Sequence, residues 1–97
     1  MKRIFISGGI TNVHDYINRF CEAERELIDR GYTSIVNPAV VNVNLPIDFS
    51  HEDYMEVSLA ELRCCGAVYM LKGWKDSAGA VQEHNTAKRL EMEIIYQ

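Results

Sequence analysis

The sequence of 97 residues lacks the features that commit a chain to a membrane or to a nucleic acid. No apolar run approaches the roughly 20 residues that a membrane-spanning helix needs, and the apolar start at Ile4 is too short for the core of a signal peptide. We therefore expect a cytoplasmic protein with no membrane partner. The net charge is −4 and no block of basic residues occurs, which argues against nucleic-acid binding through phosphate neutralisation.

Cysteine is scarce, and its three residues are Cys21, Cys64 and Cys65. An odd number that includes an adjacent pair is a poor disulfide framework, so we expect reduced thiols. No CxxC or HxxxH spacing is present, and we predict no metal site. The chain also lacks internal repeats, the GxGxxG dinucleotide fingerprint and the GxxxxGK(S/T) phosphate loop.

What the chain does have is an alternation of short apolar runs with amphipathic segments. We expect four strands, at residues 3–7, 33–37, 67–71 and 93–96. We expect three helices, at residues 12–30, from Ser50 onward with Asp53 at the capping-box position, and from Ser77 to about Met92. This order predicts one α/β domain over residues 1–97. Its fold would be a small doubly wound, Rossmann- or flavodoxin-like three-layer sandwich with a parallel sheet of four to five strands.

Two loops fall where such sheets bind ligands, at the carboxyl ends of strands near a reversal of strand order. In a 2-1-3-4 order, the loops after the first and third strands line one cleft. The first loop holds Ser7, Gly8, Gly9 and Ile10, which can bring backbone amides to a base or a sugar or can simply form a tight turn. Residues 39–49 are the longest irregular stretch, and loops of this length are often functional.

The second loop leads into the most informative stretch, residues 73–84. Ser77 is placed to cap a helix whose free N–H groups favour an anion, and Gly79 would let a ligand approach the backbone. Glu83 lies less than two turns further on and is either a nucleophile or general base, or a solvated carboxylate. Trp74 either stacks on a nucleobase or packs against the helix end. Asp53 is expected to cap its helix first and to bind a ligand second.

Together these segments resemble the nucleoside 2-deoxyribosyltransferase-like superfamily, and most closely a short branch of uncharacterised bacterial and phage proteins. The resemblance covers essentially the whole chain. The matching elements are Ser7-Gly8-Gly9-Ile10-Thr11, Asn37-Pro38, Asp53-Tyr54-Met55 and Gly73-Trp74-x-x-Ser77-x-Gly79-Ala80-x-x-Glu83.

The resemblance implies cleavage or transfer of the N-glycosidic bond of a 2′-deoxynucleoside or its 5′-monophosphate. Glu83 would be the nucleophile that attacks C1′ and forms a deoxyribosyl ester, as the carboxylate of a retaining glycosidase does. Ser77 and Gly79 would hold the sugar or phosphate, and the first loop would line the base and sugar. The resemblance further implies no cofactor, a small-molecule nucleoside or nucleotide as partner, and a homodimer or higher homo-oligomer.

Two positions depart from the superfamily's pattern. Relatives commonly carry an aspartate where this chain has Gly66, and often another where it has Ser58. In the enzymes such aspartates position the sugar or handle protons at the base. Three alternatives therefore stay open from sequence: a deoxyribosyltransferase or N-glycosidase, a catalytically impaired nucleotide-binding protein that senses or sequesters its ligand, and an interaction protein with a vestigial cleft.

Overall fold

The computed structural model describes residues 1–10 and 15–97, and its centre is a parallel sheet of four strands. The strands are β1 (Ile4–Ser7), β2 (Ile35–Val36), β3 (Ala67–Met70) and β4 (Glu93–Tyr96), in the order β2-β1-β3-β4. Ile4 pairs with Ile35 on one side and with Ala67 on the other, so β1 and β3 run side by side at the centre. The predicted α/β class, the parallel sheet and the strand order are confirmed.

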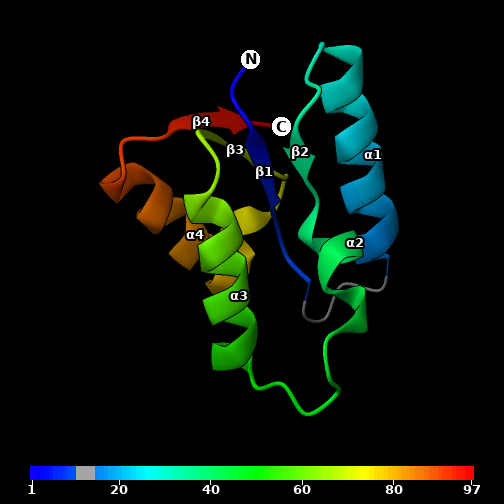
Figure 1. Cartoon of the computed structure of the whole chain (residues 1–97), viewed down its shortest axis with the longest axis vertical. Helices are drawn as coiled ribbons and strands as arrows, with labels where there is room; N and C mark the ends of the chain where they lie inside the picture. The colour runs from blue at the N-terminus through cyan, green and yellow to red at the C-terminus, as the bar shows by residue number, and fades with distance from the viewer. Residues whose placement is uncertain (11–14) are drawn as a thin grey trace.

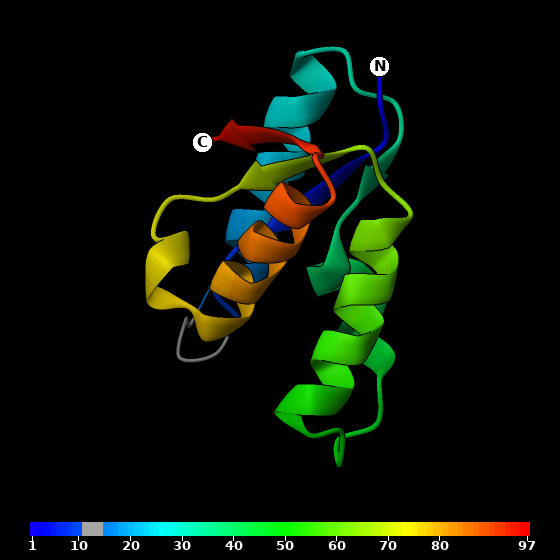
Figure 2. The ribbon, with the colours of Figure 1, turned by 90° about the vertical axis from the view of Figure 1, so that its left-hand side faces the viewer.

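Helices cover both faces of this sheet, as the three-layer prediction requires. Helix α1 (Tyr16–Asp29) lies on one face, and α3 (His51–Arg63) and α4 (Ala78–Arg89) lie on the other (Figures 1 and 2). A short helix α2 (Pro38–Val41) and two 3₁₀ turns, η1 (Asn42–Asn44) and η2 (Trp74–Asp76), complete the described elements. No helix within the two described ranges is long and apolar enough to cross a bilayer.

The structure corrects the expected bounds of three elements. The stretch after Pro38 is not irregular throughout, because Pro38 stands at the first helical position and the Asn37 side chain caps α2 by accepting from the Ala39 amide. Helix α4 ends at Arg89 rather than near Met92, because Glu91 turns the chain with a φ of 56°. Strand β2 keeps only two residues, and the expected helix start at Asn12 lies outside the described residues.

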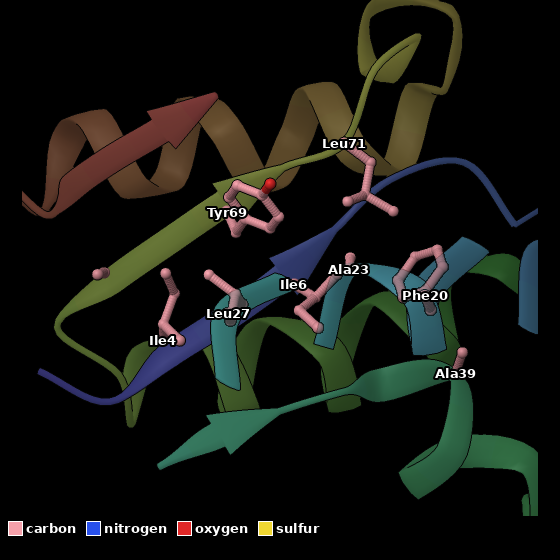
Figure 3. Close-up of a cluster of buried hydrophobic side chains, with 9 residues drawn as sticks. Ile4, Ile6, Phe20, Ala23, Leu27, Ala39, Tyr69 and Leu71 are labelled. Carbon is pink, nitrogen blue, oxygen red and sulfur yellow. The ribbon is translucent and has the colours of Figure 1, made fainter. Parts of the chain in front are cut away.

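Two hydrophobic clusters hold the layers together, and the alternation along β1 divides them. Ile4 and Ile6 face α1 and pack with Phe20, Leu27 and Tyr69 in the cluster shown in Figure 3. The other cluster lies under α3 and α4. Its buried members are Phe5, Leu62, Val68, Met70, Ala80 and Ala87. Because side chains alternate along a strand, Ser7 shares the face of Phe5 and points toward the α3 and α4 layer.

Candidate functional site

A cavity of about 750 Å³ opens at the carboxyl ends of β1 and β3. It is lined by both predicted loops, by the start of α1, by α2 and η1, and by the facing sides of α3 and α4. The polar and aromatic lining residues are Tyr16, Phe20, Asn42, Phe49, His51, Tyr54, Ser58, Asp76, Ser77 and Glu83. The cavity lies beside the point between β1 and β3 where the strand order reverses, which is the position that doubly wound folds use for ligands.

Glu83 is the buried acid of this cavity, with 6% of its surface exposed. It lies on the inner stripe of α4 between Ala80 and Ala87, at spacings of three and four residues, so the helix turns it toward the sheet. Ser7 comes from the end of β1 on the same face of the sheet. The Ser7 hydroxyl donates to Glu83 Oε1 at 2.6 Å, joining residues 76 positions apart in the sequence.

The second carboxylate oxygen of Glu83, Oε2, accepts no hydrogen bond from the described residues. Oε1, by contrast, is occupied by Ser7. Among the described residues, every side-chain oxygen that is fully shielded from solvent has a hydrogen-bond partner. Since Glu83 lines the cavity, Oε2 is open to it. One oxygen is therefore held and the other is presented, which is the geometry of an oriented nucleophile or base.

Burial raises the pKa of Glu83 to about 7. Loss of hydration is the largest cause, and the negative charge of Glu61 adds to it, while the hydrogen bond from Ser7 acts in the opposite direction. A carboxyl group with this pKa is about half ionised at neutral pH. Perturbed acids of this kind, set in a cavity, are typical of functional sites.

The amino terminus of α4 lies in the same wall. Ser77 caps the helix by accepting from the Ala80 amide at 3.2 Å. The amides of Ala78 and Gly79 donate to no described acceptor, and both residues line the cavity. A Cβ at Gly79 would lie 3.2 Å from Met55 Sδ. Glycine there lets α3 approach α4 closely, which is a packing reason beside the expected approach of a ligand.

The structure brings together most of the predicted site residues. Gly8, Ile10, Ser77, Gly79 and Glu83 line the cavity, and Ser7 reaches it through Glu83. Gly8 also has a packing role, because a Cβ there would lie 3.0 Å from Leu71 Cβ. Gly9, Asp53 and Trp74 are not among the described lining residues.

Asp53 and Trp74 have structural partners instead. Asp53 accepts from the Ser50 amide while Ser50 accepts from the Asp53 amide, which completes the predicted capping box of α3. The Trp74 ring stacks on His84 with centroids 4.1 Å apart, and His84 Nε2 lies 2.8 Å from the Tyr96 hydroxyl. Of the two interpretations of Trp74, the structure therefore shows packing against the helix.

Several wall residues were not predicted from the sequence. His51 and Tyr54 lie at the start of α3, Asp76 precedes Ser77, and Asn42 sits on η1. The presence of three asparagine or aspartate residues in the stretch 39–49 was the available signal for Asn42. Glu61 was also missed, because its partner Asn42 is 19 positions away and only the fold joins them.

The two departures from the superfamily's pattern lie at opposite ends of the sheet. Ser58 is in the cavity wall and is 7% exposed. Gly66 precedes β3 at the amino end of the strands, where its amide donates to Arg3 and a Cβ would contact the Lys2 side chain. An aspartate at position 66 would lie at the opposite end of β3 from the cavity, whereas position 58 lies in the cavity wall.

The charge of the cavity wall is negative. Glu83 and Asp76 are acids, and His51 is the one described lining side chain that can carry a positive charge. No set of three or more His, Cys, Asp or Glu side chains in the described ranges is placed to hold a metal ion.

One family model matches the chain, that of a domain of unknown function (DUF4406), over residues 2–96. No curated protein and no solved structure matches the chain.

Proposed function

The chain belongs to the DUF4406 family, a domain of unknown function, and we propose from its cavity that it cleaves or transfers the N-glycosidic bond of a 2′-deoxynucleoside or deoxynucleotide. The observation that carries this proposal is the Glu83 carboxyl, buried at the wall of a cavity of about 750 Å³, with one oxygen held by Ser7 and the other open. The resemblance to the nucleoside 2-deoxyribosyltransferase-like superfamily supports the same assignment.

The proposed reaction has two steps that balance through Glu83. In the first, Oε2 of the ionised carboxylate attacks C1′, and the electron pair of the C1′–N bond leaves with the base, which takes up a proton. In the second, water attacks C1′, the ester C1′–O bond breaks and returns its electron pair to the carboxylate, and the proton that water loses replaces the one that the base took up. A second base in place of water gives transfer. This is the double displacement of retaining glycosidases.

The remaining wall supplies the contacts that such a reaction needs. The free amides of Ala78 and Gly79 with the Ser77 hydroxyl offer donors to the sugar hydroxyls or a 5′-phosphate. A cavity of this size, with aromatic walls and few polar groups, is typical of small-molecule sites. A proton for the leaving base has to come from water or from a wall group such as Asp76 or His51, because Ser58 does not titrate.

The test is product chromatography after incubation with 2′-deoxynucleosides and their 5′-monophosphates, with and without a free acceptor base. We expect free base or a swapped nucleoside from at least one substrate. Glu56→Gln, which removes an exposed carboxylate from α3, should match the wild type. Intact substrates throughout the panel would contradict the proposal.

The second candidate is a nucleotide-binding protein without turnover, and the observation that favours it is Ser58 in the cavity wall. Thermal stabilisation by a deoxynucleotide with no product would establish this candidate. Ligand at about 100 times its Kd adds about 2.7 kcal/mol to the free energy of unfolding, which is readily measured in a small domain. A homodimer or higher homo-oligomer and a cytoplasmic location stay predictions for either candidate.

A further inference from the structure

Asn42 carries a polar group that the reaction at Glu83 does not use. It lies on η1, is 9% exposed and lines the cavity. Its Nδ2 donates to Glu61 Oε1 at 3.2 Å, and Glu61 is a half-buried residue of α3. The hydrogen bond between Asn42 and Glu61 therefore joins η1 to α3 at the cavity wall.

This hydrogen bond fixes which way the Asn42 amide points. An ionised carboxylate accepts hydrogen bonds and donates none, so Glu61 holds the nitrogen side of the amide. The carbonyl Oδ1 then points away from Glu61. No described residue donates to Oδ1. Every described side-chain oxygen that is fully shielded from solvent has a hydrogen-bond partner, so Oδ1 is not among the shielded atoms. Because Asn42 lines the cavity, Oδ1 is an oriented acceptor open to a ligand.

The cavity that Asn42 lines also presents aromatic surface that suits a flat base. Phe49 and Tyr54 line the same cavity, with ring centroids 5.7 Å apart in an edge-to-face arrangement. Val43 adds apolar surface beside Asn42. The groups proposed to hold the sugar, at Glu83 and the start of α4, come from different elements. A few placed polar groups in a mostly apolar cavity are the usual means by which such sites fix the orientation of a ligand.

We propose that Asn42 Oδ1 accepts a hydrogen bond from an N–H donor of the substrate's base, and that Glu61 is the positioning residue that holds the amide in this orientation. This inference rests on the proposed function, and it narrows the substrate class to 2′-deoxynucleosides whose base carries an exocyclic amino group. A base with only acceptors on that edge would leave the buried Oδ1 unpaired, and the site would disfavour it.

The test compares substrates that differ only in this donor. One pair is 2′-deoxyadenosine and purine 2′-deoxyriboside, and the other is 2′-deoxycytidine and the 2-pyrimidinone 2′-deoxyriboside. We expect the wild type to favour the amino member of at least one pair by about tenfold in kcat/KM, the effect of one ordinary hydrogen bond. Asn42→Ala should remove this preference.

Glu61→Gln tests the positioning role separately. Glutamine can donate to Oδ1 as well as accept from Nδ2, so the Asn42 amide is no longer held in one orientation. The preference for the amino member should fall several-fold, through a higher KM for that member with little change in KM for the other. Glu56→Gln, on the exposed part of the same helix, should leave the ratio unchanged.

Calorimetry on the Glu83→Gln variant separates this inference from the proposed function. It measures binding of the same two pairs without turnover. A preference for the amino member that Asn42→Ala abolishes supports the inference even if the wild type is inactive. Equal affinities within both pairs, or a preference that survives Asn42→Ala, would overturn it even if the wild type cleaves every substrate.

Discussion

Glu83→Gln is expected to lower product formation from 2′-deoxynucleosides by at least about 10³-fold, as loss of a nucleophile does in other covalent enzymes. Glutamine has nearly the same shape, and its amide oxygen can still accept from the Ser7 hydroxyl that now lies 2.6 Å from Oε1. The variant should therefore keep the cavity intact. It lacks only the charge and the nucleophilic oxygen that the proposed mechanism needs.

The same substitution is expected to stabilise the fold at neutral and alkaline pH. The folded pKa of Glu83 is raised from 4.5 to about 7, so the unfolded chain ionises first as the pH rises, and the native state loses stability between pH 4.5 and 7. Glutamine does not ionise, so the variant does not lose stability in this way as the pH rises. Relative to the wild type, Glu83→Gln should gain about 3 kcal/mol in unfolding free energy from pH 4.5 to above pH 7.

Urea unfolding at pH 5 and pH 8 measures this gain, with Glu56→Gln as the control for removal of an exposed carboxylate. A gain in stability together with loss of turnover would mark Glu83 as a residue kept for activity at a cost in stability. An inactive variant that is also destabilised at every pH would instead mean that the substitution has damaged the cavity. Full activity in a well-folded Glu83→Gln protein would refute its role as nucleophile.

The second large effect is the dependence of kcat/KM on pH. In the proposed mechanism only ionised Glu83 attacks C1′, and the ionised fraction falls about tenfold per pH unit below the pKa of about 7. We expect kcat/KM to fall by about 50-fold from pH 7, where Glu83 is half ionised, to pH 5, and to level off above pH 8. Initial rates of base release at low substrate concentration measure this profile.

Two variants assign the profile to Glu83. The charge of Glu61 raises the pKa of Glu83, so Glu61→Gln should move the midpoint to lower pH. The hydrogen bond from Ser7 lowers that pKa, so Ser7→Ala should move the midpoint to higher pH. The other described lining side chains that can ionise are unchanged in both variants: Tyr16, His51, Tyr54 and Asp76. Midpoints that do not move in these opposite directions would show that another group controls the rate.

The sequence predicted the parts of this structure that depend on local pattern. Short apolar runs such as Ile4-Phe5-Ile6 predict the strands, and the capping signals at Ser50 and Ser77 predict the starts of α3 and α4. The parallel strand order then brings the two loops to one cavity. Glu83 could be singled out because it follows the helix cap by a fixed spacing.

The sequence could not predict the contacts between distant segments. Nothing local shows that Ser7 meets Glu83, or that Glu61 holds Asn42, because sheet pairing and helix packing bring these pairs together. The aromatic ring of Trp74 suits a base and a helix surface equally well, and only the position of His84 decides between them. The remoteness of Gly66 from the cavity likewise depends on which end of β3 it occupies.

The most direct test of the central claim is mass spectrometry of the acid-quenched protein after brief mixing with the deoxynucleoside that it cleaves fastest. The proposed mechanism predicts a mass increase of one deoxyribosyl group, located by digestion to the peptide that contains Glu83 and absent from Glu83→Gln. Base release by the wild type with no adduct under any quench time, or with an adduct on another residue, would contradict the assignment of Glu83 as the nucleophile.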